Sequence, residues 1–346
     1  MISFPMLDQL PVGRRRCLLI APLSFYTFHK SLSYGLEKKG FVVDVINDEF
    51  PDNVLGKILG KIFIPLLRKL TLWGLHARLG GQPPYDLVLI IKGRGLGVES
   101  LAYLRTKALN LIGYNFDSFL FNPSPLDWQH LTDRYATFDI QDAKKYGLPL
   151  VHLFSDIKST PAVVRDFDIS IIQRIHSNRL VLVGQLLRAL PTSVRAFIFL
   201  YEKNIFTFAL GVLRFPIHYA RLWPYISFRP LSHTQAMQAL GRSRVTFDFA
   251  HPLQSGITIR CFEAQSLGVA IYTNNPEVIE SGLFSHSGVA CFSGCSDSKA
   301  LVAMCLDLMK HIPAQRCRSI EEFLDELLFI GAPIAPSTFN IGRVLS

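Results

Sequence analysis

The stretch from residue 247 to residue 275 reads FDFAHPLQSGITIRCFEAQSLGVAIYTNN. An apolar run ends in a polar turn around Ser255 and Gly256, a helical pattern starts near Ile257, and the apolar run VAIYTNN (269–275) follows. A strand, a turn, a helix and a second strand form a βαβ unit, in which the strands are parallel and the crossover is right-handed. The stretch therefore predicts a parallel α/β sheet.

The same alternation of strands and helices occupies both halves of the chain. In the first half, the predicted strands are RCLLIAP (16–22), FVVDVIND (41–48), YDLVLIIKG (85–93), LNLIGYNFDS (109–118), YATFDI (135–140) and LPLVHLFS (148–155). After a charged hinge, STPAVVRDFD (159–168), they are ISIIQRI (169–175), VRAFIFLY (194–201), RVTFDFA (244–250), VAIYTNN (269–275) and GVACF (288–292). Two such sets predict two Rossmann-like, doubly wound domains facing each other across a cleft.

The length of 346 residues fits two domains of ordinary size. We place an N-terminal domain at residues 1–160 and a C-terminal domain at residues 161–346, with the last helix packing back on the N-terminal domain. The composition, 49% hydrophobic and 18% charged, is globular and could fill two buried sheets.

The net charge of +9 is concentrated in one part of the chain. Between Ile169 and Phe247 there are ten Lys or Arg residues and one acid, Glu202. Such a segment favours anionic partners: phosphates, nucleic acid or an acidic lipid surface. The alternative is a solvated basic face without a partner.

The insertion VLGKILGKIFIPLLRKLTLWGLHARLG (54–80) has a basic amphipathic pattern. Its apolar residues at helical spacing are Leu55, Ile58, Leu59, Ile62, Phe63, Leu66, Leu67 and Leu70, and its basic residues include Lys57, Lys61, Arg68 and Lys69. This pattern suits an anionic membrane surface. It equally suits a domain helix that packs on the sheet and is kinked at Pro65.

No segment has the composition of a transmembrane helix. The most apolar stretch, NIFTFALGVLRFPIHYA, is interrupted by Arg214 and Pro216, whereas a span needs about 20 apolar residues. The N-terminus also lacks the order of a signal peptide. We therefore expect a cytoplasmic protein, with residues 54–80 allowing peripheral attachment to the inner membrane face.

Two candidate sites lie at predicted strand ends of the first half. KGRGLG (92–97) is a glycine-rich turn that would present Lys92 and Arg94 to an acceptor. Asp117, in NFDS (115–118), could act as general base on an acceptor hydroxyl. Alternatively, Asp117 or Ser118 caps backbone N–H groups of the following turn.

The first predicted strand of the second half ends in HSNR (176–179), where His176, Ser177 and Arg179 are candidates for binding the phosphates of a donor. A lone histidine is more often structural than functional.

The turn in the opening stretch predicts the main anion site. Gln254, Ser255 and Gly256 let the backbone approach a ligand, and the following helix directs its N–H groups and positive dipole end at the same point. Thr258 and Arg260 suit phosphate oxygens, and Glu263, on the Arg260 face of the helix, could accept from ribose hydroxyls. The alternative is an exposed Arg–Glu helix pair that contributes about 0.2–0.5 kcal/mol.

No metal site or bound cofactor is predicted. Asp166-Phe167-Asp168 resembles a metal-binding DxD motif, but it lies in the hinge without a second acidic cluster. The six cysteines form no CxxC pair and no zinc-binding spacing.

The pattern H-P-x-Q-x-G-x-T-x-R-x-x-E followed by T-N resembles the second domain of GT-B glycosyltransferases, in particular bacterial CgeB-like and capsule or lipopolysaccharide transferases. The matching residues are His251, Pro252, Gln254, Gly256, Thr258, Arg260, Glu263, Thr273 and Asn274. YDLVLIIKGRGL, NFDS, TFDIQDAKKYGL and HSNR are also similar, so that the resemblance covers most of residues 15–310. Two positions depart from it: Ser255 stands where many GT-B enzymes carry Glu, and Arg94 stands where the relatives often have an acid.

The resemblance implies two GT-B domains, with a nucleotide-sugar donor on the second, Asn274 among its ligands, an acceptor on the first and no obligatory metal. We therefore expect a glycosyltransferase of polysaccharide biosynthesis that moves a sugar from a nucleotide-diphosphate donor to a cell-surface glycan or lipid-linked acceptor. The alternatives are a nucleotide-sugar epimerase, a degenerate transferase that only binds, and a nucleic-acid binder. The last is disfavoured because the basic residues form no recognised RNA or DNA module.

Overall fold

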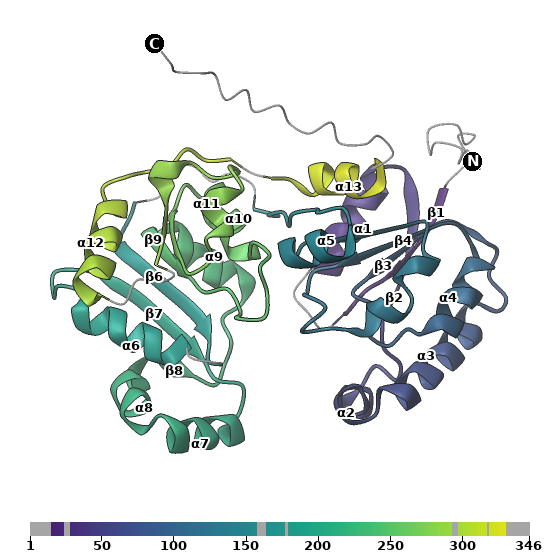
Figure 1. Cartoon of the computed structure of the whole chain (residues 1–346), viewed down its shortest axis with the longest axis horizontal. Helices are drawn as coiled ribbons and strands as arrows, with labels where there is room; N and C mark the ends of the chain where they lie inside the picture. Colours follow the sequence, from purple (N-terminus) through teal and green to yellow (C-terminus); the bar gives the residue numbers. More distant parts are fainter. Residues whose placement is uncertain are drawn as a thin grey trace, which may run out of the picture. The chain divides into compact units, whose positions relative to one another are not determined.

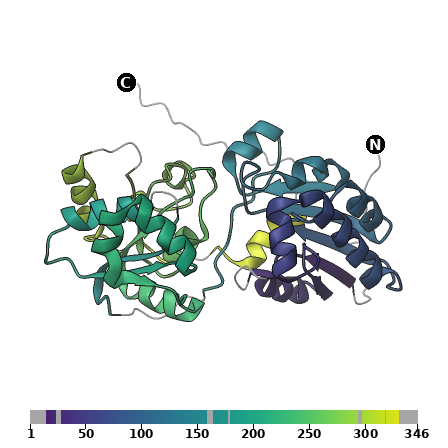
Figure 2. The same cartoon turned by 90° about the horizontal axis from the view of Figure 1, so that it is seen from below.

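The computed structural model describes residues 15–23, 28–157, 164–176, 179–292, 297–316 and 318–329. These residues form two compact units, each built on one parallel sheet with helices on both faces (Figure 1 and Figure 2). The first unit holds the described residues up to Phe138, Asp142–Val151 and those from Ile320 onward. The second unit holds Asp139–Gln141 and the described residues from His152 to Ser319.

The sheet of the first unit has the strand order β2-β1-β3-β4-β5. Its strands are β1 (Arg15–Ile20), β2 (Phe41–Ile46), β3 (Tyr85–Ile91), β4 (Ala108–Asn115) and β5 (Arg134–Thr137), and its helices include α1 (Phe28–Lys38), α3 (Ile64–Leu79), α4 (Val98–Arg105) and α5 (Ile140–Tyr146). Leu75 and Leu79 of α3 and Leu101 and Leu104 of α4 pack with strand residues in one buried core. Because β3 is buried at nearly every position, it reads as a continuous apolar run, as parallel strands do.

The last described helix, α13 (Ile320–Phe329), belongs to the first unit. It buries Phe323 against Phe28 of α1 and Tyr114 of β4, in edge-to-face contacts with ring centroids 6.3 and 5.1 Å apart. Ion pairs from Lys38 and Lys39, at the end of α1, reach acidic residues of α13. Among the described residues after Val151, the first unit therefore contains α13 alone.

The sheet of the second unit has the order β11-β10-β9-β6-β7-β8. Its strands are β6 (Phe167–Arg174), β7 (Ala196–Tyr201), β8 (Ile226–Ser227), β9 (Ser243–Asp248), β10 (Ala270–Thr273) and β11 (Val289–Cys291). One core packs residues of α6 (Arg179–Ala189), α8 (Pro216–Leu222) and α12 (Ser298–Leu308) against one face of the sheet, whereas α9 (His233–Gly241) and α10 (Ile259–Ser266) pack together elsewhere on it. When β6 is numbered as strand 1 and the sheet is read from β8 to β11, the strand order is 3-2-1-4-5-6, which is that of the Rossmann fold.

The predicted amphipathic insertion is two helices rather than one. α2 (Val54–Ile62) and α3 are separated at Phe63, just before Pro65, close to the predicted kink. α3 buries Leu67 and Leu75 as a domain helix, whereas α2 leaves Ile58 and Ile62 exposed. α3 is therefore a domain helix, whereas membrane attachment through α2 stays a prediction.

Two further expectations are corrected by the structure, and one strand was not predicted. The predicted strand 148–155 forms only an isolated bridge between Leu150 and Thr137. The two acids assigned to the hinge are bound to the second unit: Asp166 pairs with Arg242, and Asp168, within β6, pairs with Arg195 and Arg244. The short strand β8 had no predicted counterpart. Among the described residues, no helix combines the length and apolar content needed to cross a bilayer.

A leucine at position 35 should loosen α13. A Cβ atom at Gly35 would lie 2.7 Å from both Ile320 Cγ1 and Leu324 Cδ1, so that a larger side chain must displace the helix. We expect Gly35→Leu to lower the free energy of unfolding by about 1–3 kcal/mol, the usual cost of overpacking. Urea unfolding measures this, with Gly81→Leu as the control, because a Cβ atom there meets nothing within 4 Å. Equal stability of the two variants would contradict the packing described.

Candidate functional site

The strands β6 and β9 are neighbours in the second sheet, and the strand order reverses between them. In doubly wound sheets, ligands bind at the carboxyl ends of the strands at such a reversal. The loops that follow the two strands meet there, because the rings of His176, after β6, and His251, after β9, lie 5.5 Å apart. This edge of the sheet is the candidate site.

Two asparagine side chains tie the turn between β9 and α10 to the end of β10. The N–H of Ala250 donates to Asn274 Oδ1 at 2.7 Å, and Asn274 Nδ2 donates to the Ala250 carbonyl at 3.3 Å. Asn275 Nδ2 donates to the carbonyls of Ser255 and Gly256 at 3.2 and 3.1 Å. Both side chains fix the turn, and a donor-binding role for Asn274 stays a prediction.

The same turn donates hydrogen bonds to a buried carboxylate, that of Asp139. The N–H and Oγ of Ser255 donate to it at 2.7 and 2.8 Å, and the N–H of Gly256 donates at 3.3 Å. Asp139, which is 1% exposed, is grouped with the second unit. The turn thus holds an anionic group of its own chain, and a ligand role for Ser255 and Gly256 stays a prediction.

Asp248, the last residue of β9, connects the strand ends with the start of α10. Its buried carboxylate accepts from Thr258 Oγ1 at 2.7 Å and from Thr273 Oγ1 at 2.9 Å, and the Cys261 thiol lies 3.6 Å away. Thr258 is the N-cap residue of α10, but its side chain makes no capping hydrogen bond because its hydroxyl is directed to Asp248. The Thr258 side chain therefore leaves the first N–H groups of α10 uncapped.

Glu263 lies inside α10 with a buried carboxylate. Arg260 Nη1 is 3.1 Å and His233 Nδ1 is 3.9 Å from its oxygens, while neither carboxylate oxygen accepts a hydrogen bond from a described residue. Burial raises the pKa of Glu263, and the charges of Arg260 and His233 lower it in part. A buried carboxylate without hydrogen-bond donors is costly, so this group is equipped to accept hydroxyl donors from a ligand.

Arg179 and His176 complete this edge. Arg179 Nη2 donates to the Phe249 carbonyl at 2.6 Å, and the guanidinium lies over the Phe249 ring; burial lowers the pKa of Arg179 to about 10. Burial, and next the charge of Arg179, lowers the pKa of His176 to about 3, so its ring is neutral near pH 7.

Gln254, which is half-buried, donates its backbone N–H to the His251 carbonyl. Ser177 lies outside the described residues.

In the first unit, the structure pairs two of the predicted residues. Lys92 Nζ lies 2.6 Å from Asp117 Oδ2, and both side chains are largely buried at the ends of β3 and β4. Lys92 has a positive φ of 67°, a backbone conformation that non-glycine residues rarely adopt, and this conformation is part of the turn after β3. The predicted capping is provided by Ser118, whose Oγ accepts from the N–H of Phe121.

Arg94 is engaged by its own unit. Its guanidinium donates to the Gly60 carbonyl of α2 and lies 3.6 Å from Glu49, and its backbone N–H donates to Asp48. Arg94 therefore anchors α2 beside the turn, and contact with an acceptor stays a prediction.

Asp48 was not among the predicted residues. It is 2% exposed, and its pKa is raised to about 7, first by burial and then by the charge of Glu49. Because Asp48 ionises near pH 4 when unfolded, the folded protein binds more protons between about pH 4 and pH 7. The contribution of Asp48 to stability therefore falls as the pH rises through that window.

Asp48→Asn should remove this pH dependence. We expect the variant to match the wild type near pH 4 and to exceed its free energy of unfolding at pH 8 by something on the order of 1–4 kcal/mol. Urea unfolding across this range measures the difference, with the exposed Asp52→Asn as control. If the free energy of unfolding changes with pH in the same way in the wild type and in Asp48→Asn, burial does not raise the pKa of Asp48.

One signal in the sequence marks Asp139 and Asp248, two of the carboxylates that were not predicted. Phe-Asp occurs at or just after the ends of three strands, giving Asp117 after β4, Asp139 after β5 and Asp248 at the end of β9. Polar residues that end apolar parallel strands lie at the ligand-binding edge of a sheet. Only the first of these pairs was used in the prediction.

The fold resembles that of several solved structures. Sucrose-phosphate synthase from Thermosynechococcus elongatus matches with a TM-score of 0.57 and 10% identity over 91% of this chain and 95% of that chain. The UDP-GlcNAc 2-epimerase from Methanocaldococcus jannaschii matches with 0.54 and 12% over 91% and 99%. HepE from Anabaena, in complex with UDP and glucose, matches with 0.53 and 13% over 91% and 96%.

These similarities confirm the predicted fold class: two Rossmann-like α/β domains of the GT-B type. No family model and no curated protein matches the chain. The narrower resemblance to CgeB-like transferases therefore stays a prediction.

Proposed function

We propose that the protein is a glycosyltransferase whose second unit binds a nucleotide-diphosphate sugar. The observation that carries the proposal is Glu263: a buried carboxylate that pairs with Arg260 one turn away but accepts no hydrogen bond from a described residue, at the ligand-binding edge of a Rossmann-type sheet. Two adjacent ribose hydroxyls would supply the missing donors. Charge-assisted hydrogen bonds of this kind contribute about 1.5–3 kcal/mol each.

The diphosphate would bind beside this carboxylate. The start of α10 offers backbone N–H groups and the positive end of the helix dipole, and Arg260 and Arg179 supply positive charge. As the bond between sugar and diphosphate breaks, these groups would stabilise the negative charge of the leaving group. This electrostatic role makes the reaction independent of a metal in our proposal. The Asp139 carboxylate would hold the 255–256 turn in shape beside the diphosphate.

The first unit would supply the acceptor site. In an inverting transfer, the acceptor oxygen attacks the anomeric carbon and loses its proton to Asp117, and Lys92 holds that carboxylate in place. The acceptor would be a cell-surface glycan or a lipid-linked sugar. The exposed apolar side chains of α2 support peripheral attachment at an anionic membrane surface, on the cytoplasmic side.

A second candidate is epimerisation of a nucleotide sugar, because UDP-GlcNAc 2-epimerases share the fold. The same Glu263 and Arg260 would bind the nucleotide in that reaction. Incubation with UDP-sugars separates the two: an epimerised product without any acceptor supports the epimerase, whereas transfer that requires a glycan supports the transferase.

Nucleotide binding should depend on Glu263. A calorimetric titration with UDP, GDP, ADP, TDP and CMP, with and without magnesium, identifies the ligand. We expect Glu263→Gln, which keeps the side-chain shape, to weaken binding of that ligand by about 10- to 100-fold. Arg260→Ala is a poorer test, because it would leave the buried Glu263 carboxylate unpaired and destabilise the fold as well.

The control for this titration is Glu280→Gln, the same change at an exposed position of the same unit. Unchanged affinity in a normally folded Glu263→Gln variant would refute the assignment of Glu263 to the ribose. Absence of binding by any nucleotide would refute the proposed function itself.

Asp117→Asn should separate binding from turnover. Loss of a general base typically costs about 10²–10⁴ in rate, while the donor site on the second unit is left intact. Release of nucleoside diphosphate from the donor, with water or a glycan as acceptor, measures the rate, and titration checks the affinity. Asp127→Asn, at an exposed carboxylate of the same unit, serves as control. Turnover equal to that of the control variant would exclude Asp117 as the base.

A further inference from the structure

The helix α7 (Ile205–Arg214) in the second unit has apolar side chains on two opposite sides. Phe208, Val212 and Phe215, just after the helix, pack on the core, and Phe208 contacts the rings of Tyr219 and Trp223. The other side carries Phe206, Leu210 and Leu213, which are 77%, 68% and 81% exposed. A helix that is apolar on all sides is normally buried on all sides. The exposed side of α7 is therefore a candidate interaction surface.

The next helix, α8, packs against α7 and also carries an exposed apolar side chain. Ile217 of α8 is 67% exposed, and Phe215 and Pro216 form the corner between the two helices. We call Phe206, Leu210, Leu213 and Ile217 the α7–α8 surface. Exposed aromatic and aliphatic side chains in one amphipathic segment are typical of proteins that lie in a membrane interface.

The helices α7 and α8 contain the basic residues Arg214 and Arg221 and no acid. From Ile169 to Phe247, the chain has ten basic residues and a single acid, Glu202. Glu202 is 2% exposed, and its carboxylate accepts from Thr207 Oγ1 and Tyr219 OH. Four of the ten basic residues are engaged elsewhere, since Arg179 lies at the candidate site and Arg195, Arg242 and Arg244 pair with Asp166 and Asp168. The other six have no exposed acid within the segment, and such a composition attracts anionic lipid headgroups.

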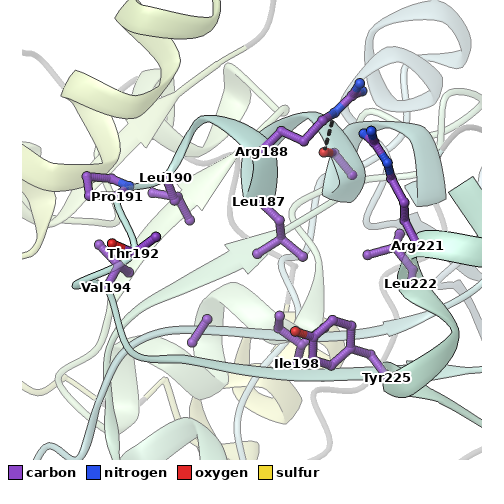
Figure 3. Close-up of a pocket in the computed structure, with 12 residues that line it drawn as sticks. Leu187, Arg188, Leu190, Pro191, Thr192, Val194, Ile198, Arg221, Leu222 and Tyr225 are labelled. Carbon is purple, nitrogen blue, oxygen red and sulfur yellow. Dashed lines mark hydrogen bonds between the residues drawn. The ribbon is translucent and has the colours of Figure 1, made fainter.

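A pocket of about 450 Å³ lies beside α8 (Figure 3). Leu187, Leu190, Val194, Ile198 and Leu222 are among the lining residues, and the exposed surface of the wall is more polar than apolar. In Figure 3 the side chains of Arg188, from α6, and Arg221, from α8, extend to the same side of the pocket. Neither arginine forms an ion pair with a described carboxylate.

A pocket that combines two arginines with leucine, valine and isoleucine side chains suits the headgroup end of a phospholipid. The guanidinium groups suit the phosphate oxygens of a headgroup, and the aliphatic side chains suit the first part of an acyl chain. We propose that the α7–α8 surface and this pocket dock the protein on an anionic phospholipid bilayer. The inference does not depend on which reaction the protein catalyses.

Two other occupants fit the surface less well. A second copy of the chain, paired through the same surface, would place cations against cations, because a two-fold interface is self-complementary. A nucleic acid would satisfy the arginines but not Leu210, Leu213 and Ile217, since aliphatic side chains gain nothing from a phosphate backbone. The lipid bilayer satisfies both the charge and the apolar area.

The first unit has a corner of the same construction. Asn53 accepts from Gly56 N–H at the start of α2, and Phe63 ends that helix just before Pro65. In the same way, Asn204 accepts from Thr207 N–H at the start of α7, and Phe215 ends that helix just before Pro216. Each unit thus has a short helix with an asparagine cap and exposed apolar side chains. Two such helices matter because stable attachment to membranes generally requires more than one weak contact.

Flotation of the full-length chain with lipid vesicles tests the proposal. We expect binding to phosphatidylcholine vesicles that contain roughly one third phosphatidylglycerol, weaker binding at high salt, and little binding to pure phosphatidylcholine. Equal binding to both vesicle types, or no binding to either at low salt, would overturn it.

Matched variants locate the contact. Leu213→Ser should weaken vesicle binding by about tenfold, whereas Ile312→Ser, at a site 70% exposed in the same unit, should leave it unchanged. Arg188→Gln and Arg221→Gln should each weaken it by about fivefold, and more than Arg229→Gln, which removes the same charge outside the pocket. All five positions are exposed, so the variants should fold. If Leu213→Ser weakens vesicle binding no more than Ile312→Ser, or if the two pocket arginine variants weaken it no more than Arg229→Gln, the lipid contact lies elsewhere.

Discussion

The candidate donor site depends on the carboxylate of Asp248. This buried group accepts hydroxyls from Thr258 and Thr273, and so joins the ends of β9 and β10 to the first residue of α10. Because it directs the Thr258 hydroxyl away from the helix, it also leaves the start of α10 uncapped by that side chain. The direction of α10, and with it the place of Arg260 and Glu263, follows from these bonds.

A second carboxylate, that of Asp139, stabilises the turn that precedes α10. It satisfies N–H groups of Ser255 and Gly256 that would otherwise be buried without an acceptor. Glu263 differs from both carboxylates, since it has a charged neighbour but neither of its oxygens accepts a hydrogen bond from the part of the chain that the structure describes. A buried ion pair of this kind adds little to stability by itself, and that is a physical reason to assign it to ligand binding.

Local patterns predicted much of this arrangement. The strand, turn and helix of 247–275, the alternation that gives two doubly wound sheets, and the pairing of Arg260 with Glu263 follow from periodicity and spacing within a few residues. The contact of Asp139 with Ser255 joins residues 116 apart in sequence, so that no local pattern could show it. Likewise, apolar residues at helical spacing predicted a helix at 54–80, but only tertiary packing decides that α3 is buried and α2 exposed.

The central claim is that the edge formed by β6, β9 and α10 binds a nucleoside diphosphate. Hydrogen–deuterium exchange of the full chain, with and without each of UDP, GDP and ADP, tests it directly. The account predicts slower exchange in residues 249–262 and at the start of α6 with one of these nucleotides, and unchanged exchange in α7. Protection confined to other segments, or no protection with any nucleotide at saturating concentration, would contradict it.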